Sequence, residues 1–525
     1  MGLSTTSDQI TPEELERGSR RLMLDAAFAT IIGTLNSGVV LVAYALFLGA
    51  SSTTIGVLAA IPFLTQLLQA PTVALVERLQ SRRLVAVTCL FVARLALPLM
   101  AVLGYLPDRD LALALLVVGE TIHCAFNSVA GCAWNAWIRD LVPDARMGAF
   151  FARRTVYATA SGILGTGAAA AALQVADPGG GGQPLVFALL YGFGFLSSLA
   201  STWQLTRVPE FTRPGRTARQ PLLSMLAQPF RDPNFVRLIR FFASWQFAVN
   251  LAAPFFSVFI MQQLGFSAGF VLLLSIVSQL SNIAVVRAWG RLTDGFTNKS
   301  VLTLAAPLFI ACIAAMALAG QAGPSSWTIA YLVVLHVLMG LTSAGVALAS
   351  VAIGLKLAPR GAASAYVGTN ALVTAAAAGV APLLAGAYAD FFAARELRFR
   401  ISWSAPGEAL DLVSIAVGWW QFFFLISAAL GLYSLHRLSF VQEVGEVPRG
   451  QMLQHILNVA RRGVRNASTV AGLRAAVAFP AGGVIAEHTG STGEDGPEGD
   501  AASPRDGVGG AAHAGGGGAG RGTPA

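Results

Sequence analysis

The sequence predicts an all-α polytopic membrane protein in which twelve transmembrane helices form two six-helix halves. Of its 525 residues, 55% are hydrophobic and only 12% are charged, whereas soluble domains of average composition carry about 25% charged residues. Mostly apolar runs of roughly 20 residues, long enough to cross a bilayer, recur from Leu24 to His436. Short features of the turns also recur at an offset of about half the chain. A soluble fold is not expected, because too little polar sequence separates the apolar runs.

The apolar runs define the spans and their orientation. Arg and Lys gather in the turns after even-numbered spans, and such turns face the cytoplasm under the positive-inside rule. Both termini are therefore expected in the cytoplasm. The basic group at Arg395–Arg400, in the longest outer loop, is the local exception. The spans cover residues 24–48, 55–76, 84–106, 111–138, 155–176, 185–206, 237–263, 266–288, 300–320, 328–354, 362–390 and 414–436.

Three matches in the turns indicate an internal repeat. Leu48-Gly49 matches Leu264-Gly265, and Glu77 matches Asp294. The third match pairs Leu141-Val142-Pro143 with Leu357-Ala358-Pro359. All three share nearly the same spacing, which we call the half-chain offset. Chance similarity among apolar helices is a weak explanation, because the matches lie in turns. The repeat predicts two halves related by a pseudo-twofold axis.

The composition also divides the chain into segments. We expect a cytoplasmic N-terminal segment at 1–22, the first six-helix half at 23–206, a cytoplasmic central loop at 207–236 and the second half at 237–436. Residues 437–480 are basic and amphipathic, and they form either a helix on the anionic inner leaflet or a loosely helical tail. Residues 481–525 are rich in Gly and Ala, cannot bury a core and are expected to be disordered.

Composition and motifs argue against several classes of function. The net charge of +8 comes from Arg residues in the turns, as membrane topology requires, so no nucleic-acid partner is expected. The four Cys lie in apolar spans without metal-ligand spacing, and no nucleotide loop or nucleophile triad is present. We therefore expect neither an enzyme nor a metal or other cofactor. The preference for Arg over Lys, with abundant Ala and Gly, suggests a bacterial protein of the cytoplasmic (inner) membrane.

Polar residues inside the spans are the candidates for a substrate site, because ionisable groups at bilayer depth usually face a bundle interior or a wet cavity. Glu120, His123 and Asn127 fall on one narrow face of the fourth span at 100° per residue. His336 in the tenth span follows Glu120 by the half-chain offset and is expected at a matching depth. Arg94 in the third span is the only Arg expected near the middle of the bilayer.

Arg94 and Glu120 are both expected near the bilayer centre and could form a pair. The pair is either a structural ion pair or a functional one, in which Glu120 or His123 exchanges a proton beside Arg94. His123 and His336 have the alternative of being neutral rings bonded to a neighbouring helix. Asp25, at the cytoplasmic start of the first span, is interpreted as a helix cap.

The turn after the eighth span reads Gly290-Arg291-Leu292-Thr293-Asp294, and the turn after the second reads Leu75-Val76-Glu77-Arg78. Both resemble the G-x-L-x-D-R-x-G-R-R signature of the major facilitator superfamily of secondary transporters, although both lack its inner Gly. The resemblance covers about residues 20–440 and implies that family's fold. It also implies a cytoplasmic gate at Glu77, Arg78, Gly290 and Asp294, for which the alternative is a topology signal with surface charge.

The resemblance further implies a central cavity lined by spans 1, 4, 7 and 10. The expected function is transport of a small organic solute by alternating access, with proton coupling through Glu120 assisted by His123 or His336. The expected partners are a small-molecule substrate, membrane lipids and protons, and the expected state is a monomer. The alternatives are a lipid or amphipathic-drug translocase and, because of the long tail, a sensor or assembly protein that does not transport. The candidate site residues are Asn36, Arg94, Glu120, His123, Asn127, Gln246, Asn250 and His336.

Overall fold

The computed structural model describes residues 12–79, 81–175, 182–210, 222–319, 325–359, 362–393, 395, 397–405 and 408–443. The expected N-terminal segment lies partly within this part of the chain, because α1 already begins at Pro12. The expected amphipathic segment is described only over 437–443, and the Gly- and Ala-rich tail lies outside the described residues.

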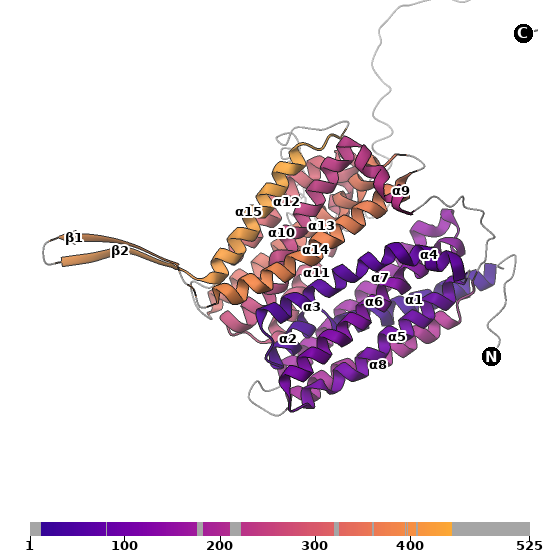
Figure 1. Cartoon of the computed structure of the whole chain (residues 1–525), viewed down its shortest axis with the longest axis horizontal. Coiled ribbons are helices and arrows are strands. Elements are labelled where there is room, and N and C mark those ends of the chain that lie inside the picture. The colour runs from indigo at the N-terminus through magenta and orange to yellow at the C-terminus, as the bar shows by residue number, and fades with distance from the viewer. Residues whose placement is uncertain are drawn as a thin grey trace, which may run out of the picture. The chain divides into compact units, whose positions relative to one another are not determined.

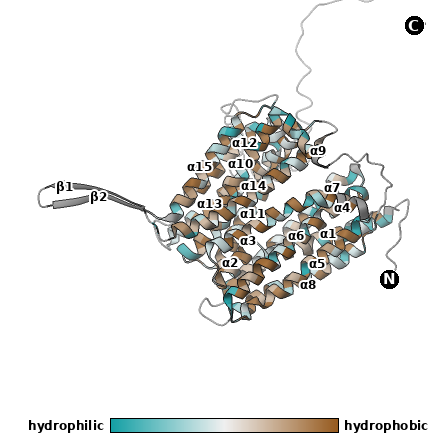
Figure 2. Ribbon diagram, viewed as in Figure 1, coloured by the Kyte–Doolittle hydropathy of each residue, from teal (hydrophilic) through white to brown (hydrophobic). Residues whose placement is uncertain are grey.

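Twelve helical spans in the described residues are long and apolar enough to cross a membrane, which confirms the predicted number. Hydrophobic residues dominate these helices along their length (Figure 2). The spans of the first half are α1 (Pro12–Asn36) with α2 (Val39–Phe47), α3 (Ser52–Leu64) with η1 (Thr65–Leu68) and α4 (Gln69–Leu79), α5 (Arg82–Val102) with η2 (Leu103–Tyr105), α6 (Arg109–Leu141), α7 (Asp144–Val175) and α8 (Gln183–Thr206). After α9 (Leu222–Ala227) and η3 (Gln228–Arg231), the second half has α10 (Pro233–Val258) with η4 (Phe259–Gln263), α11 (Ala268–Gly295), α12 (Asn298–Met316), α13 (Ser326–Leu357), α14 (Ala363–Phe392) and α15 (Trp419–Ser439).

The helices form two bundles, α1–α8 and α10–α15 (Figure 1). Two helix pairs make most of the contact between the bundles: α3 packs against α14, and α7 packs against α11. By the half-chain offset, α11 is the counterpart of α3, and α14 is the counterpart of α7. These two contacts between the bundles are therefore repeats of each other.

Glycines allow these helix pairs to approach closely, as small residues commonly do between transmembrane helices. A Cβ atom on Gly386 of α14 would lie 2.5 Å from the carbonyl oxygen of Ser52. A Cβ atom on Gly269 of α11 would lie 2.7 Å from the carbonyl oxygen of Ala170 in α7. Any larger side chain at either position would push the two bundles apart.

The repeated Leu-Gly pairs end the first and seventh spans in the same way. Gly49 and Gly265 have φ angles of 88° and 72°, in the left-handed region that favours glycine. The amide of Ala50 bonds back to the carbonyl of Ala45, as in the usual left-handed helix termination. The sequence match therefore marks a shared turn geometry in the two halves.

A β-hairpin connects α14 to α15, a feature that the sequence analysis did not predict. Strand β1 (Leu397–Ala405) pairs antiparallel with β2 (Glu408–Val417), from Leu397 opposite Val417 to Ala405 opposite Glu408. In β1, apolar residues alternate with Arg or Ser, which is the period of a strand. The hairpin occupies the loop with the exceptional basic group. It also moves the start of the twelfth span from the predicted residue 414 to Trp419.

A glutamate binds the start of the third span within each half. The side chain of Glu210 accepts hydrogen bonds from the Ser81 hydroxyl (2.9 Å) and the Arg83 amide (3.0 Å) at the start of α5. Glu443 accepts one from the Lys299 amide (2.8 Å) at the start of α12. Carboxylates are favoured at helix N-termini, where amides lack partners and the helix dipole is positive. Each half is thus tied together at the end predicted to face the cytoplasm.

Candidate functional site

Each half contains a pocket at an equivalent position, and we call them the N-pocket and the C-pocket. The N-pocket, of about 330 Å³, is lined by residues of α1, α5, α6, α7 and α8. The C-pocket, of about 560 Å³, is lined by residues of α10, α12, α13 and α14. About half of the residues that line the N-pocket have a lining counterpart at the half-chain offset, including Ala29 with Trp245, Asn127 with Ser343 and Arg154 with Asn370. The pockets are therefore related by the internal repeat.

A buried chain of hydrogen bonds links a carboxylate to a guanidinium in the wall of the N-pocket. Arg94 Nη2 donates to Ser201 Oγ (2.8 Å), and Ser201 Oγ donates to Asp25 Oδ1 (2.6 Å). Arg94 and Asp25 are each 3% exposed, and Ser201 is fully buried. A buried charge without a partner of opposite sign strongly destabilises a protein, so buried charges are usually paired. The hydroxyl of Ser201 therefore mediates an ion pair between α1 and α5.

This chain corrects two expectations. Asp25 does not cap the first span, because α1 begins at Pro12 and places Asp25 in the helix interior, bonded to Ser201. Arg94 does not pair with Glu120, because its bonded partner is Ser201. The carboxylate of Glu120, 2% exposed, instead accepts a hydrogen bond from Cys124 Sγ at 3.1 Å, one turn further along α6.

Two cations of the N-pocket keep donors without partners. Nη1 of Arg94 and Nε of Arg154 are buried and make no hydrogen bond within the described part of the chain. The Arg154 guanidinium lies over the ring of Trp134, with 4.6 Å between its carbon and the ring centroid. The side-chain amide of Asn36 is also buried without a partner among the described residues, packed against Gly194 of α8. Unpartnered buried donors cost free energy, so this pocket is arranged to bind hydrogen-bond acceptors.

The structure separates the candidate residues into two groups. Asn36, Arg94, His123 and Asn127 line the N-pocket, and Gln246 lines the C-pocket. The remaining candidates Glu120, Asn250 and His336 line neither pocket.

The two candidate histidines, His123 and His336, are hydrogen-bonded to backbone carbonyls. His123 Nδ1 lies 3.0 Å from the carbonyl oxygen of Ala93 in α5. His336 Nδ1 lies 2.8 Å from that of Leu332 in its own helix. For His123 this is the alternative arrangement, a ring bonded to a neighbouring helix. His336 instead bonds within α13, away from the walls of both pockets.

Asp25 and Arg154 line the N-pocket but are not among the candidates predicted from sequence, because both lie near the ends of predicted spans. Arg154 directly precedes the predicted fifth span, in the basic turn. However, α7 begins at Asp144, so Arg154 lies nearly three turns inside the helix. For Arg154, the repeat was a signal that could have found it, since Arg154 and Asn370 are separated by the half-chain offset.

The predicted cytoplasmic gate is only partly described. Glu77 and Arg78 lie on α4 and Asp294 on α11, but their side chains fall outside the described residues. Gly290 faces α13, where a Cβ atom would lie 4.0 Å from the Leu348 side chain. The gate at these residues stays a prediction.

At the ends of the bundles that lie away from the predicted gate, polar contacts join the two halves. Following the predicted orientation, we call these ends of the bundles the outer ends. Asp390 of α14 accepts hydrogen bonds from the amides of Ser52 (3.0 Å) and Thr53 (2.8 Å) at the start of α3. At the repeat-related position, Gln174 of α7 accepts a hydrogen bond from Ser267, which caps the start of α11.

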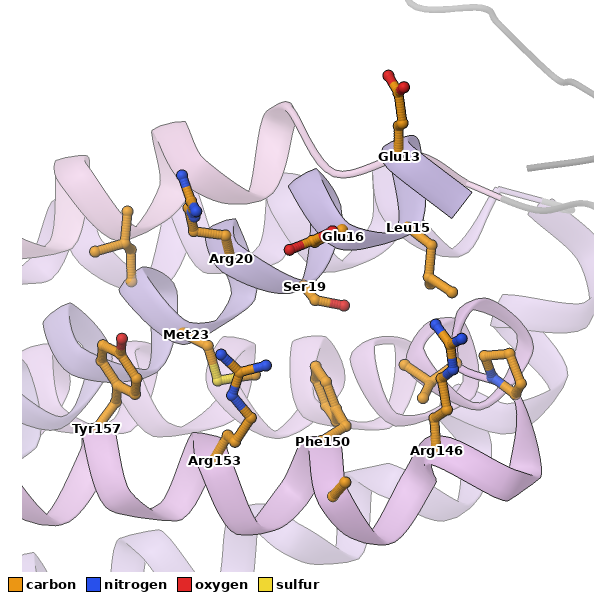
Figure 3. Close-up of a pocket in the computed structure, with 14 residues that line it drawn as sticks. Glu13, Leu15, Glu16, Ser19, Arg20, Met23, Arg146, Phe150, Arg153 and Tyr157 are labelled. Carbon is orange, nitrogen blue, oxygen red and sulfur yellow. The ribbon is translucent and has the colours of Figure 1, made fainter. Parts of the chain in front are cut away.

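A third cavity lies between the first parts of α1 and α7. We call it the cytoplasmic groove, following the predicted orientation. It has a volume of about 760 Å³ and combines Arg20, Arg146 and Arg153 with the rings of Phe150 and Tyr157. Side chains of Arg146, Phe150 and Arg153 extend from α7 towards α1 (Figure 3). Glu13 and Glu16 also line the cytoplasmic groove and reduce its positive charge.

Comparisons with known proteins agree with this architecture. The family model for the Major Facilitator Superfamily matches residues 26–382. The solved structure of a point mutant of the nucleoside transporter NupG is 13% identical, with a TM-score of 0.63 over 81% of this chain and 100% of that chain. A bacterial homologue of the iron transporter ferroportin, in an inward-facing state, is 11% identical, with a TM-score of 0.61 over 82% and 99%.

A bacterial homologue of the human lysosomal transporter Spinster, inward-facing and unoccupied, is 16% identical, with a TM-score of 0.53 over 82% of this chain and 95% of that chain. At such identities the structural likeness shows the fold alone. No curated protein sequence matches this chain significantly. The family match covers more than half of the chain and confirms a transporter class rather than an enzyme. The chain belongs to the Major Facilitator Superfamily of membrane transporters.

Proposed function

We propose that the protein is a secondary transporter that moves a small organic solute across a bacterial cytoplasmic membrane by alternating access. The observation that carries this proposal is the pair of repeat-related pockets, one in each half. In inverted-repeat transporters, substrate binds between the halves near the midplane, and the halves rock around it. Two pockets of equivalent position and different chemistry suit one solute held between the two halves.

The contacts between the halves support the alternating-access part of the proposal. The outer ends are joined at Asp390 and at Gln174, and both contacts are hydrogen bonds to the start of a helix in the other half. Few such bonds need to break for the outer ends to separate. This arrangement corresponds to a state closed at the outer ends.

Proton coupling is the finer part of the proposal. Glu120 is a candidate proton carrier because it is buried in an apolar helix, with a thiol as its bonded neighbour. Asp25 is the candidate that the geometry favours, because it lines the N-pocket and binds Arg94 through Ser201. A proton on Asp25 would remove the negative charge that holds Arg94, and it would leave the guanidinium available to substrate.

The test begins with thermal unfolding of the purified protein against a metabolite library, because a ligand that binds only the folded state raises the unfolding midpoint. Compounds that stabilise the protein are then offered to proteoliposomes with and without a pH gradient. Uptake driven by the gradient in wild type, retained in Glu120→Gln and lost in Asp25→Asn protein that is still folded and still binds the compound, supports the scheme. Compounds that bind but never enter the vesicles would contradict transport and favour a sensor or assembly role.

The cytoplasmic groove favours a second candidate, translocation of a lipid or amphipathic drug. Its three arginines, beside Met23, Phe150 and Tyr157, can hold a charged headgroup next to an apolar chain. Transfer of a fluorescent amphiphile between leaflets by reconstituted protein would identify this activity. Loss of that transfer in Arg153→Gln, with solute uptake unchanged, would assign the activity to the groove.

A further inference from the structure

The two pockets differ in charge, although the repeat relates their positions. The N-pocket is lined by the ionisable residues Asp25, Arg94, His123 and Arg154. The residues that line the C-pocket carry no ionisable side chain. At the position of Arg154, the second half has Asn370. The pseudo-twofold axis therefore relates a charged pocket to a neutral one.

Charge in the N-pocket is not balanced by its own lining residues. Asp25 faces two guanidiniums, Arg94 and Arg154, and it is joined to the first through Ser201. His123 bonds to the Ala93 carbonyl and supplies no negative charge. A guanidinium presents a planar fork of donors that suits a carboxylate or phosphate, and charge-assisted bonds to such groups are the strong ones. Arg94 Nη1 and Arg154 Nε are buried donors without a partner in the described part of the chain.

The C-pocket is built from aromatic surface with a few polar groups. The ring of Trp245 lies 5.9 Å from that of Phe309, centroid to centroid, and Phe242 lies in the same wall. Trp245 occupies the position that Ala29 has in the N-pocket, so a large ring fills one half where the other half leaves space. The side-chain oxygen of Asn370 is buried, and no described residue donates to it. This surface suits an apolar or aromatic body that carries a hydrogen-bond donor.

We infer that the substrate is an amphipathic organic anion. Its acidic group binds Arg94 and Arg154 in the N-pocket, and its apolar body packs on Trp245 and Phe309 in the C-pocket. This inference rests on the proposed transport function, because the two pockets are taken as opposite walls of one site. Burial of the apolar body supplies affinity. The acidic group fixes the orientation of the substrate and neutralises the excess positive charge of the N-pocket.

The test measures binding to the full-length protein in a non-ionic detergent at pH 7. The probes are 2-naphthoate and decanoate, each compared with its neutral amide, and acetate as an acid without an apolar body. We expect both acids to raise the unfolding midpoint, their amides to have at most a tenth of that affinity, and acetate to have no measurable effect. Equal binding of acids and amides, or no binding of either acid, overturns the inference.

Variants separate the two parts of the site. In Arg154→Gln, affinity for both acids should fall about tenfold to a hundredfold while affinity for the amides stays unchanged. In Trp245→Ala, affinity should fall for acids and amides alike, so that their ratio is kept. Arg139→Gln is the matched control, because Arg139 is exposed at the end of α6 and lines neither pocket. Arg154→Gln that binds the acids as tightly as wild type overturns the assignment of the acidic group.

Transport is read separately, so that the two proposals fail in different ways. Acids that bind through Arg154 but do not enter proteoliposomes leave the ligand class intact and contradict the transporter. Uptake of a neutral or cationic compound that Arg154→Gln does not affect leaves the transporter intact and contradicts the anionic substrate.

Discussion

Asp390, near the end of α14, accepts a 2.8 Å hydrogen bond from the backbone amide of Thr53 in the first turn of α3. The two residues belong to different halves and are far apart in the sequence. The second carboxylate oxygen accepts a hydrogen bond from the amide of Ser52. One side chain therefore binds two amides that have no partner within the first turn of the helix. A carboxylate there also interacts favourably with the helix dipole. Asp390 therefore links the outer ends of the two halves.

Removing this link should favour the outward-open state. The bonds are charge-assisted but Asp390 is exposed to solvent, so Asp390→Ala should shift the equilibrium by about 0.5–1.5 kcal/mol, roughly twofold to tenfold. The readout is labelling of a cysteine introduced at Ala29 of the N-pocket, using a reagent that cannot cross the membrane. Cys89, Cys124, Cys132 and Cys312 are replaced first. Outside labelling should increase in the variant.

Gln174→Ala is the control at the repeat-related position. Gln174 is neutral and accepts from Ser267, so its loss should have a smaller effect than that of Asp390. Equal labelling of wild type and Asp390→Ala would show that the bond does not hold the outer ends together.

The glycine contacts between α3 and α14 predict an effect of the same sign. A Cβ on Gly56 would overlap the Pro382 carbonyl oxygen, so Gly56→Ala forces backbone against backbone. Overpacking of this kind costs about 1–3 kcal/mol, and here it acts only when the outer ends are closed. We expect more outside labelling of the cysteine at Ala29. Gly192→Ala on α8 has open space around its Cβ and should leave labelling unchanged.

The Asp25–Ser201–Arg94 chain predicts strong coupling between its charged members. Asp25→Asn leaves Arg94 as an uncompensated buried charge and should destabilise the protein by about 3–5 kcal/mol. Adding Arg94→Gln should recover a large part of this loss, which a double-mutant cycle of unfolding midpoints measures. Additive losses would mean that the two charges do not compensate each other.

The contacts of Glu443 predict that part of the free energy of unfolding depends on pH. Its carboxylate is buried at the start of α12 and accepts hydrogen bonds from Lys356 Nζ (2.8 Å) and the Lys299 amide. Burial alone would raise the pKa of Glu443, but the bonds from Lys356, Lys299 and Asn298 outweigh burial and hold this pKa below its ordinary value of 4.5. Because the pKa of Glu443 is lower in the folded state than in the unfolded state, ionisation of this carboxyl stabilises the folded protein. This stabilisation is fully present at pH values above the ordinary pKa.

This stabilisation is lost as the pH falls below 4.5 and through the lower folded-state pKa. Glu443→Gln should therefore destabilise the folded protein at pH 7, by about 1.5–3 kcal/mol if the charge-assisted bonds are lost, and lower its unfolding midpoint. The difference between variant and wild type should shrink below pH 4.5. A difference that is constant with pH would contradict the assignment to the ionised carboxylate.

The spans and their number could be predicted from the sequence, because crossing a bilayer requires long apolar helices whatever their neighbours are. The repeat was also visible, because Leu48-Gly49 and Leu264-Gly265 mark the same left-handed turn in both halves. The β-hairpin was not predicted, although Leu397–Ala405 alternates like a strand, because a single short alternating segment between two apolar spans is also compatible with an irregular loop.

For the candidate site, the sequence identified Arg94, Glu120 and His123 as ionisable side chains inside spans, which are costly to leave uncompensated, but it placed Arg154 just outside a span. It could not determine which of them meet. Arg94 has buried carboxylates available at Glu120 and Asp25, and only helix packing decides that α8 places Ser201 between Arg94 and Asp25. The partner of a buried charge is set by the rotation and contact of neighbouring helices, which depend on small residues spread along the whole chain.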